Sequence, residues 1–379
     1  MRIEDEKLRV LLLAPEKAVG GITMWTRYLR KYSNPEKVEY RLIDTSKLYD
    51  PLGKKLGVRG VVLGLWDAIK RLVKFLIFLI TFHPHIVYLT CSPSIGLVVR
   101  DAPLMFLLHL LGICTIAHLH GGNVEKFFGG FVLRRFLVHN SLRCCRSIFV
   151  ITREVEKEGQ AIFPGGKIIY VPNMIDDTLV TDINNKYIYS IGQKSPLKLI
   201  HVAWQAPVKG SLDLVEAMRY VQTPVSCDLV GEAAAEHQKS IENQIRKYNV
   251  GDKIRLVGFK SGKDLENAFK EADMFVFPSY SEGFPYVILE AMAYGLPIIA
   301  SDVGNIREMI GFDSPEPAGL LLKHIHPISA EELAALIDKL ARDPSLRIRL
   351  SQNGRRRVSD KYMASKVVPK LEDLLKEMV

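Results

Sequence analysis

A chain of 379 residues is longer than one ordinary hydrophobic core supports, and two domains are expected. Hydrophobic residues form 48% of the chain and charged residues 25%, a balance that excludes an intrinsically disordered protein. The net charge is +9, and residues 51–150 alone contain 12 Lys and Arg against 3 Asp and Glu. This local surplus predicts an anionic partner: nucleic acid, anionic lipid or a phosphorylated ligand.

The N-terminus and the cysteines indicate a cellular compartment. The first fifteen residues contain acidic side chains and only a short apolar run, so no secretory signal peptide is expected. The five cysteines lie mostly in apolar runs and lack the spacing of a zinc site. Reduced cysteines in a cytoplasmic protein are therefore expected.

Residues 8–13 predict a buried strand and residues 22–31 a helix, with Gly20 and Gly21 in the loop between them. Paired glycines in a first strand-to-helix turn allow the backbone to approach a ligand closely. A turn that simply requires positive φ is an equally good interpretation.

Residues 61–82 predict a long apolar helix with charges clustered near its middle. A membrane span is not expected, because a spanning helix needs about 20 residues with few charges. Lys70, Arg71 and Lys74 fall on one helical side and Trp66 elsewhere, which favours a helix lying on anionic lipid. The alternative is an amphipathic helix packed on its own sheet with a solvated basic stripe.

A strand over residues 113–117 leads into His118 and His120. The C-terminal ends of parallel strands are where α/β sheets place ligands, so His120 is a candidate functional residue and His118 is expected to pack or cap. Residues 127–146 are again apolar and basic and form a second candidate lipid-facing segment. A linker is expected over residues 183–197.

The second half of the chain begins another series of strands and helices at Leu197. Lys209 follows the first strand of this series, and Gly258 lies in a turn that ends a later strand. The segment 277–300 reads as strand, loop, helix and strand, and a helix N-terminus beside a glycine-containing loop is a natural seat for phosphate.

Two carboxylates, Glu282 and Glu290, flank this expected seat. Because carboxylates repel phosphate, we expect them to accept hydrogen bonds from neutral hydroxyls such as those of sugars. The alternative is an acidic residue at a helix start together with a solvated helix residue.

The string Glu282-Gly283-Phe284-Pro285-x4-Glu290-Ala291-Met292-Ala293-x-Gly295-Leu296-Pro297, with Ser301-Asp302-Val303-Gly304 after it, resembles the signature of family 4 retaining glycosyltransferases. The resemblance is specific over roughly residues 197–310. It implies an α/β fold of the GT-B type, with two Rossmann-like doubly wound domains facing a cleft. Residues 1–187 would form an acceptor- and membrane-facing domain, 188–360 a nucleotide-sugar-binding domain, and 361–379 a helix crossing back to the first.

The resemblance also implies residue roles. Glu282, Lys209 and His120 would be catalytic, with Lys209 neutralising the donor diphosphate and Glu282 holding a hydroxyl of the transferred sugar. Glu290 would hold the ribose hydroxyls. The donor-binding set is Glu290, Gly283, Phe284, Pro285, Tyr286, Val287, Gly258, Gly20 and Gly21. Trp204 stands where the family usually has an arginine.

The expected activity is transfer, with retention, of a sugar from a UDP- or GDP-linked donor to a hydroxyl of a membrane-associated lipid or glycan acceptor. With no Asp-x-Asp motif, we expect no metal, and no cofactor besides the nucleotide sugar as co-substrate. An anionic membrane surface is an expected partner, nucleic acid is not, and the location would be the inner face of the membrane. A non-catalytic nucleotide-sugar-binding or assembly protein and a nucleotide-sugar epimerase remain alternatives.

Overall fold

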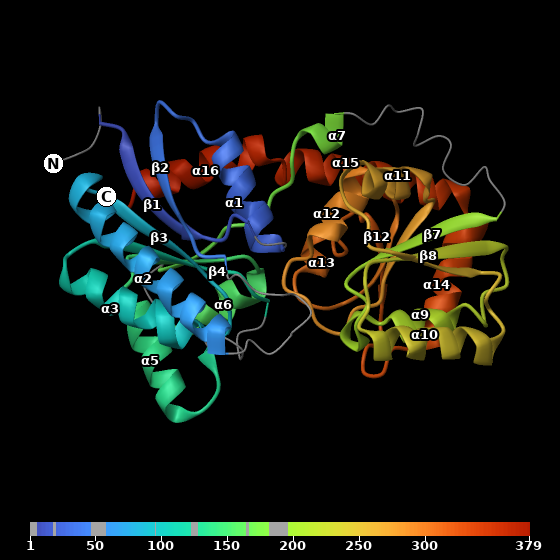
Figure 1. Cartoon of the computed structure of the whole chain (residues 1–379). Coiled ribbons are helices and arrows are strands. Elements are labelled where there is room, and N and C mark those ends of the chain that lie inside the picture. The colour runs from blue at the N-terminus through green and yellow to red at the C-terminus, as the bar shows by residue number, and fades with distance from the viewer. Residues whose placement is uncertain are drawn as a thin grey trace. The chain divides into compact units, whose positions relative to one another are not determined.

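The computed structural model describes residues 6–17, 20–46, 58–94, 96–122, 128–163, 167–181 and 196–379. Within it the chain forms two compact units (Figure 1). Unit 1 comprises Met1–Met174 and Ala364–Val379, and unit 2 comprises Ile175–Met363. Most of the linker expected over 183–197 lies outside the described residues.

Unit 1 contains a six-stranded sheet in the order β2-β1-β3-β4-β5-β6, in which every pairing is parallel. The strands are β1 (Leu8–Ala14), β2 (Val38–Asp44), β3 (Ile86–Cys91), β4 (Cys114–Leu119), β5 (Ser147–Val150) and β6 (Ile168–Tyr170). The sequence analysis did not predict β2. Its polar residues are explained by its place at the sheet edge, where Glu39 and Arg41 reach solvent.

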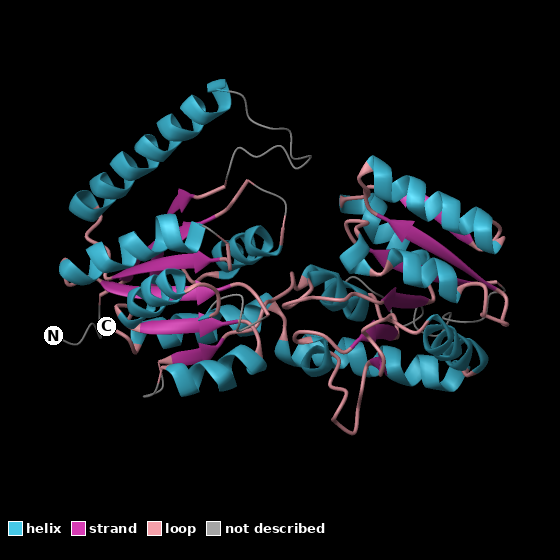
Figure 2. Cartoon of the chain, turned by 90° about the horizontal axis from the view of Figure 1, so that it is seen from below, coloured by secondary structure: helices cyan, strands magenta, loops and turns pink. Residues whose placement is uncertain are grey.

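The helices of unit 1 are α1 (Gly21–Tyr32), α2 (Val58–Thr81), the π-helical segment η1 (Leu97–Asp101), α3 (Ala102–Leu110), α5 (Val132–Arg143), α6 (Arg153–Ile162) and α16 (Ala364–Lys376). Side chains from α2, η1, α3, α5 and α6 share one hydrophobic cluster with the sheet. The helix α1 packs against α16 instead. Right-handed crossovers between parallel strands produce this division into two helical layers (Figure 2).

The helix α16 continues through Pro369, although proline commonly breaks or bends a helix. The helical conformation is interrupted earlier, between the end of α15 at Lys361 and the start of α16 at Ala364. Val367, Val368 and Leu371 are all buried, so packing against unit 1 outweighs the helix-breaking tendency of one proline.

Unit 2 contains a second parallel six-stranded sheet, in the order β12-β11-β10-β7-β8-β9. Its strands are β7 (Leu197–Val202), β8 (Val225–Val230), β9 (Ile254–Gly258), β10 (Met274–Phe277), β11 (Ile298–Ser301) and β12 (Gly319–Leu322). Its helices are α7 (Thr178–Thr181), the 3-10 turn η2 (Pro207–Lys209), α9 (Ser211–Ala217), α10 (Ala235–Tyr248), α11 (Gly262–Glu271), α12 (Tyr286–Ala293), α13 (Ile306–Met309), α14 (Ala330–Arg342) and α15 (Pro344–Lys361). The predicted α/β architecture with two series of strands and helices is confirmed.

Candidate functional site

Three loops of unit 2 meet at one edge of its sheet. The strands β11, β10 and β7 are neighbours, and because all three run parallel, their C-terminal ends lie at the same edge. The loops that follow them are residues 302–305, 278–285 and 203–210. This edge is where an open parallel sheet binds its ligands.

Backbone hydrogen bonds join the three loops to one another. The N–H of Tyr280 donates to the carbonyl of Val208 at 2.9 Å, which connects the middle loop to the loop after β7. The N–H of Asn305 donates to the carbonyl of Gly283 at 2.8 Å, which connects it to the loop after β11. The middle loop is therefore held from both sides.

Two glycines allow these loops to approach so closely. Gly304 has φ 57°, and a Cβ on it would lie 2.4 Å from the carbonyl oxygen of Glu282 and 2.7 Å from that of Gly283. Gly210 has φ 70°, and its Cβ would lie 1.8 Å from the carbonyl oxygen of Pro278. At both positions a side chain would meet backbone, which cannot move away easily.

Lys209 and Glu282 form an ion pair across the loops after β7 and β10. The Nζ–Oε1 distance is 2.6 Å, and both side chains are mostly buried. The Lys209 ammonium also lies 5.8 Å from the ring centroid of Phe277. An ammonium has three protons and a carboxylate has two oxygens, so both groups can still bind a ligand while they are paired.

The sequence analysis missed His201 of β7, whose ring centroid lies 5.9 Å from that of Phe277. Its Nδ1–H donates to the carbonyl of Val276 at 2.9 Å, and its buried Nε2 has no partner among the residues that the structure describes. Burial, together with the nearby charge of Lys209, lowers the pKa of His201 to about 4. A histidine in an apolar strand pattern was the only sequence signal, and it does not show where the ring points.

Glu290 lies on α12, the helix that follows the middle loop. Its side chain forms no hydrogen bond or ion pair with the described residues, and burial raises its pKa to about 7. Pro285 immediately precedes α12, and the N–H of Val287 has no partner among the described residues. Phe284 turns inward and packs edge-on against Tyr362, which anchors the loop. The helix N-terminus and a carboxyl without internal donors are thus available to a ligand.

The predicted Gly258 and the unusual Trp204 lie near the ends of β9 and β7. Gly258 has φ 75° and no atom within 4 Å of its Cβ position. Buried Gln205 fixes the loop after β7, since its Nε2 donates to the carbonyls of Ala203 and Val230, each at 3.0 Å. Trp204 is 42% exposed and has no ring contact with the described residues, so this ring is open to a ligand.

The remaining predicted site residues belong to unit 1. Gly20 is the N-cap of α1 with φ 150° and ψ 169°, a conformation that essentially only glycine adopts, and Gly21 begins the helix. His120 is buried, its ring centroid lies 4.0 Å from that of His118, and burial lowers its pKa to about 3. Its Nε2 has no partner in the described part of the chain. His120 is therefore a neutral imidazole.

The four expected membrane residues lie on α2. Arg71 donates to the carbonyl of Ser46 at 2.8 Å, and Lys74 donates to that of Leu42 at 3.1 Å. Lys70 lies over the ring of exposed Trp66, 5.4 Å from its centroid. Two of the three cations are thus engaged within unit 1. None of the helices that the structure describes is long and apolar enough to cross a bilayer.

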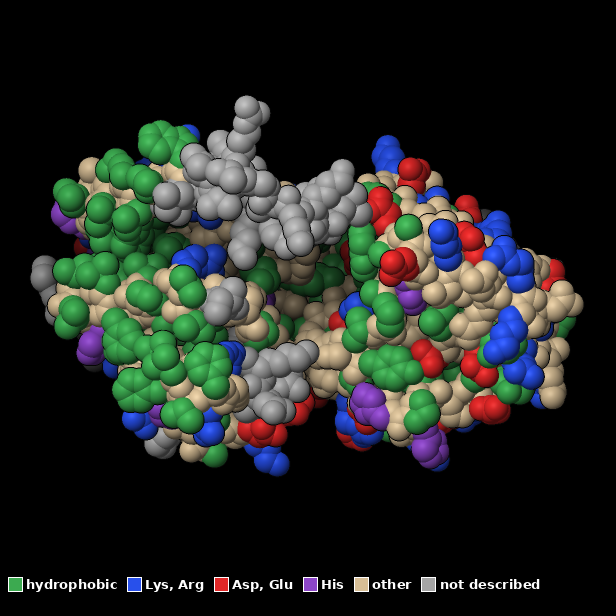
Figure 3. Space-filling model, turned by 60° about the horizontal axis from the view of Figure 1, so that its bottom comes forward, with side chains coloured by type: hydrophobic (Ala, Val, Ile, Leu, Met, Phe, Trp, Pro, Cys, Tyr) green, Lys and Arg blue, Asp and Glu red, His purple; other side chains and the backbone are tan. Residues whose placement is uncertain are grey.

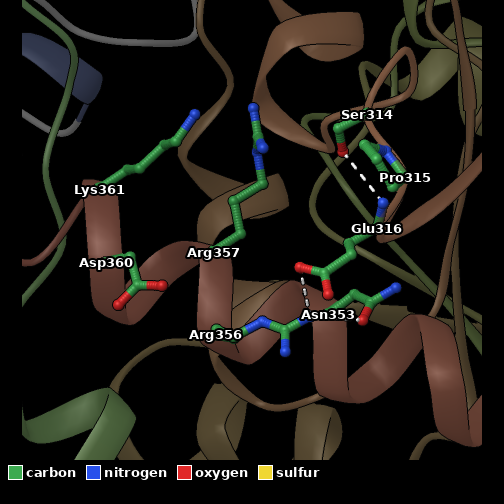
Figure 4. A pocket seen from close by; sticks show the side chains of 8 residues that line it. All are labelled: Ser314, Pro315, Glu316, Asn353, Arg356, Arg357, Asp360 and Lys361. Atoms are coloured by element: carbon green, nitrogen blue, oxygen red, sulfur yellow. Dashed lines mark hydrogen bonds and ion pairs between the residues drawn. The ribbon is translucent and has the colours of Figure 1, made fainter.

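A pocket of about 370 Å³ opens beside α15 and is lined by Ser314, Pro315, Glu316, Asn353, Arg356, Arg357, Asp360 and Lys361 (Figure 4). Arg356 pairs with Glu316 at 2.5 Å, and Arg357 donates to the carbonyl of Met309 at 2.8 Å. Both arginines are thus held by neighbouring groups of unit 2. Among the described residues no group of three or more His, Cys, Asp or Glu is placed to hold a metal ion.

Residues 190–357 match the family model described as glycosyl transferases group 1. The chain is 27% identical over 223 residues to an uncharacterized glycosyltransferase of Methanocaldococcus jannaschii, covering 57% of this chain and 56% of that protein. It is 29% identical over 156 residues to the MMP alpha-(1->4)-mannosyltransferase of Mycolicibacterium hassiacum, covering 41% of this chain and 37% of that protein. The chain thus spans about half or less of the length of these curated relatives.

A solved structure of Anabaena HepE in complex with UDP is similar over 98% of this chain and 100% of its own, with a TM-score of 0.73 and 18% sequence identity. At that identity the similarity concerns the fold alone. It confirms the predicted GT-B class, an α/β fold with two domains.

The close approach of Gly304 predicts a large stability effect. Gly304→Ala should reduce the free energy of unfolding by more than 2 kcal/mol, because a Cβ would add a backbone clash to the cost of positive φ, which is about 1–2 kcal/mol by itself. Urea unfolding of the purified variants measures this. The matched control is Gly262→Ala, which has φ 53° and open space around its Cβ position, so only the cost of positive φ applies. Equal losses in the two variants would show that the loop contact is not tight.

Proposed function

We propose that the chain, whose residues 190–357 match the group 1 glycosyl transferase model, is a retaining glycosyltransferase that uses a UDP- or GDP-linked sugar. Its acceptor would be a hydroxyl of a lipid-linked or other glycan. The observation that carries the proposal is the combination of the Lys209–Glu282 pair with the unpartnered carboxyl of Glu290 around the N-terminus of α12. This arrangement supplies a cation, a helix dipole and acceptors for hydroxyl groups.

The donor diphosphate would lie between Lys209 and the first turn of α12. When the glycosidic bond breaks, negative charge grows on the leaving diphosphate, and a fixed cation and helix N-terminus stabilise that charge. Lys209 has protons left for phosphate after pairing with Glu282, and the N–H of Val287 can donate to it. These groups are sufficient to propose a metal-independent reaction.

The two carboxylates would bind hydroxyl groups. Glu290 has no internal donor, so its oxygens can accept from both ribose hydroxyls of the nucleotide. Glu282 uses one oxygen for Lys209 and keeps the other for a hydroxyl of the sugar. His120, kept neutral by burial, would accept a hydrogen bond from a substrate hydroxyl and would not act as a proton donor.

We propose retention through attack on the same face as the leaving group. The bond between the anomeric carbon and the phosphate oxygen breaks, the acceptor oxygen bonds to that carbon from the same side, and its proton passes to the released phosphate. This path needs no protein nucleophile. A double displacement would instead need Glu282 as the nucleophile, through the oxygen that Lys209 does not hold.

Trp204 favours a second candidate function, a binding protein without transfer activity. The family resemblance places an arginine at this position, and the exposed indole supplies no charge to the diphosphate. The nucleotide could then be held by Glu290 and Lys209 while the leaving group remains under-stabilised.

A panel of UDP- and GDP-sugars, with and without membrane lipid extract, tests the proposal. We expect one donor to raise the thermal unfolding midpoint and to be consumed, with release of free nucleotide, only when extract is present. Stabilisation without consumption would support the binding protein, and no stabilisation by any donor would contradict both functions.

Glu290 gives a pH-dependent prediction. Because burial raises its pKa to about 7, nucleotide affinity should increase as the pH rises from 6 to 8 and the carboxylate forms. Glu290→Gln should weaken binding about tenfold at pH 8, the scale of a hydrogen bond to a charged group, and much less at pH 6. Calorimetric titration with the stabilising nucleotide measures both, and Glu266→Gln is the exposed control. If the ratio of wild-type to Glu290→Gln affinity is the same at pH 6 and pH 8, the proposed binding of the ribose hydroxyls by Glu290 is contradicted.

Lys209 gives a prediction about turnover. Lys209→Met keeps an apolar stem beside Phe277 but removes the charge, so kcat should fall about 100-fold or more, as is typical for loss of one group that stabilises developing charge. Steady-state nucleotide release measures the effect, with exposed Lys263→Met as the control. If kcat is unchanged in a folded Lys209→Met protein, another group neutralises the leaving diphosphate.

A further inference from the structure

One side of unit 1 exposes an unusual number of large apolar side chains. Fifteen of the twenty such exposed residues in the described part of the chain lie on α2, η1, α3, α5 and the residues that cap them, and Figure 3 shows hydrophobic side chains gathered on this unit. We call this set the apolar face: Trp66, Ile69, Leu72, Val73, Leu76, Ile77, Ile80, Val99, Leu107, Leu110, Leu111, Phe131, Val132, Leu133 and Phe136. Scattered apolar residues need no explanation, but a contiguous set of this size marks an interaction surface.

The apolar face is the outer side of helices whose inner sides are already buried. Phe75 of α2, Met105 of α3 and Val138 of α5 all lie in the same hydrophobic cluster against the sheet. The core of unit 1 is therefore complete without the outer residues. On α2 the exposed apolar residues occupy a different arc of the helix from Lys70 and Lys74, which lie together at one side of it.

The two most exposed members of the face lie at the end of α3 and at the start of α5. Leu110 and Val132 are each 83% exposed, and Phe131 and Phe136 are more than 60% exposed. Helices α3 and α5 pack directly on one another, so these side chains share one surface. The sequence analysis named residues 127–146, which include the exposed residues of α5, but it did not name the exposed residues of α3.

The described charged side chains without an ion pair around the apolar face are positive. Arg135 and Arg143 are exposed on α5, Arg146 is exposed just beyond it, and none of the three forms an ion pair within the described residues. On η1, by contrast, Asp101 is buried and neutralised by Arg100 at 2.6 Å. An occupant of this face must therefore accept apolar side chains and supply negative charge.

We propose that the apolar face binds the surface of an anionic lipid bilayer, with the outer residues of α2, α3 and α5 inserted among the headgroups and acyl chains. A bilayer satisfies both requirements, since lipid accepts the Leu and Phe side chains and acidic headgroups meet the arginines. A second copy of the chain fits less well, because a symmetric contact would bring like charges together. The inference deepens the proposed function, since a surface-bound transferase could reach a lipid-linked acceptor.

Co-sedimentation of the full-length protein with vesicles tests the proposal. We expect binding to phosphatidylcholine vesicles that contain phosphatidylglycerol, in the absence of any donor. Leu110→Gln/Val132→Gln should reduce that binding about tenfold or more, because it removes two apolar anchors without touching the core. The matched control is Leu256→Gln/Val379→Gln, which changes two exposed apolar residues outside the face and should bind like the wild type.

A variant that lacks two arginines separates the contribution of charge to vesicle binding from that of the apolar side chains. Arg135→Gln/Arg143→Gln should lose several-fold affinity for vesicles containing phosphatidylglycerol and should bind pure phosphatidylcholine vesicles like the wild type. Wild-type binding by Leu110→Gln/Val132→Gln would overturn the proposal. So would a wild-type dimer that this variant dissociates and that does not bind vesicles. Donor-induced thermal stabilisation of the same samples reports on the transferase proposal separately, so the failure of either can be recognised.

Discussion

The candidate site depends on one constraint, the close contact of three loops at the C-terminal edge of the sheet of unit 2. Parallel strands deliver these loops to one edge, but only glycine at 304 and at 210 lets them come within van der Waals distance of neighbouring carbonyls. Without that contact the loop carrying Glu282 would have no fixed position relative to Lys209. The relative positions of the functional side chains therefore depend on backbone packing, which supplies no functional group of its own.

The polar groups of the site are kept at some cost to stability. Glu290 is surrounded by protein and lacks an internal donor, and burial raises its pKa to about 7. His201 is buried with an unpartnered Nε2 beside the Lys209 charge. A ligand that supplied hydroxyl donors and phosphate oxygens would satisfy Glu290 and use the free protons of Lys209. Unmet polar capacity of this kind is typical of sites that await a substrate.

The two units differ in where their exposed apolar side chains lie. In the described part of unit 2 the exposed large apolar residues are few, namely Trp204, Val208, Leu256 and Phe259. In unit 1 the outer sides of α2, α3 and α5 are apolar although the sheet beneath them is already covered. One sequence thus encodes a polar sheet edge in unit 2 and an apolar outer face in unit 1.

The sequence by itself determined the alternation of strands and helices, because apolar runs and glycine or proline turns are local signals. It also singled out Glu282 and Glu290, which lie in one short string with a recognisable pattern, and Lys209, which follows the first strand of the second series. It missed β2, whose edge position tolerates polar residues, and His201, whose role depends on which way a buried ring points. Only the tertiary structure decided that Lys209 pairs with Glu282, 73 residues away, and that α3 and α5 present one apolar face. The physical reason is that such contacts depend on how distant segments pack, and no local pattern records that packing.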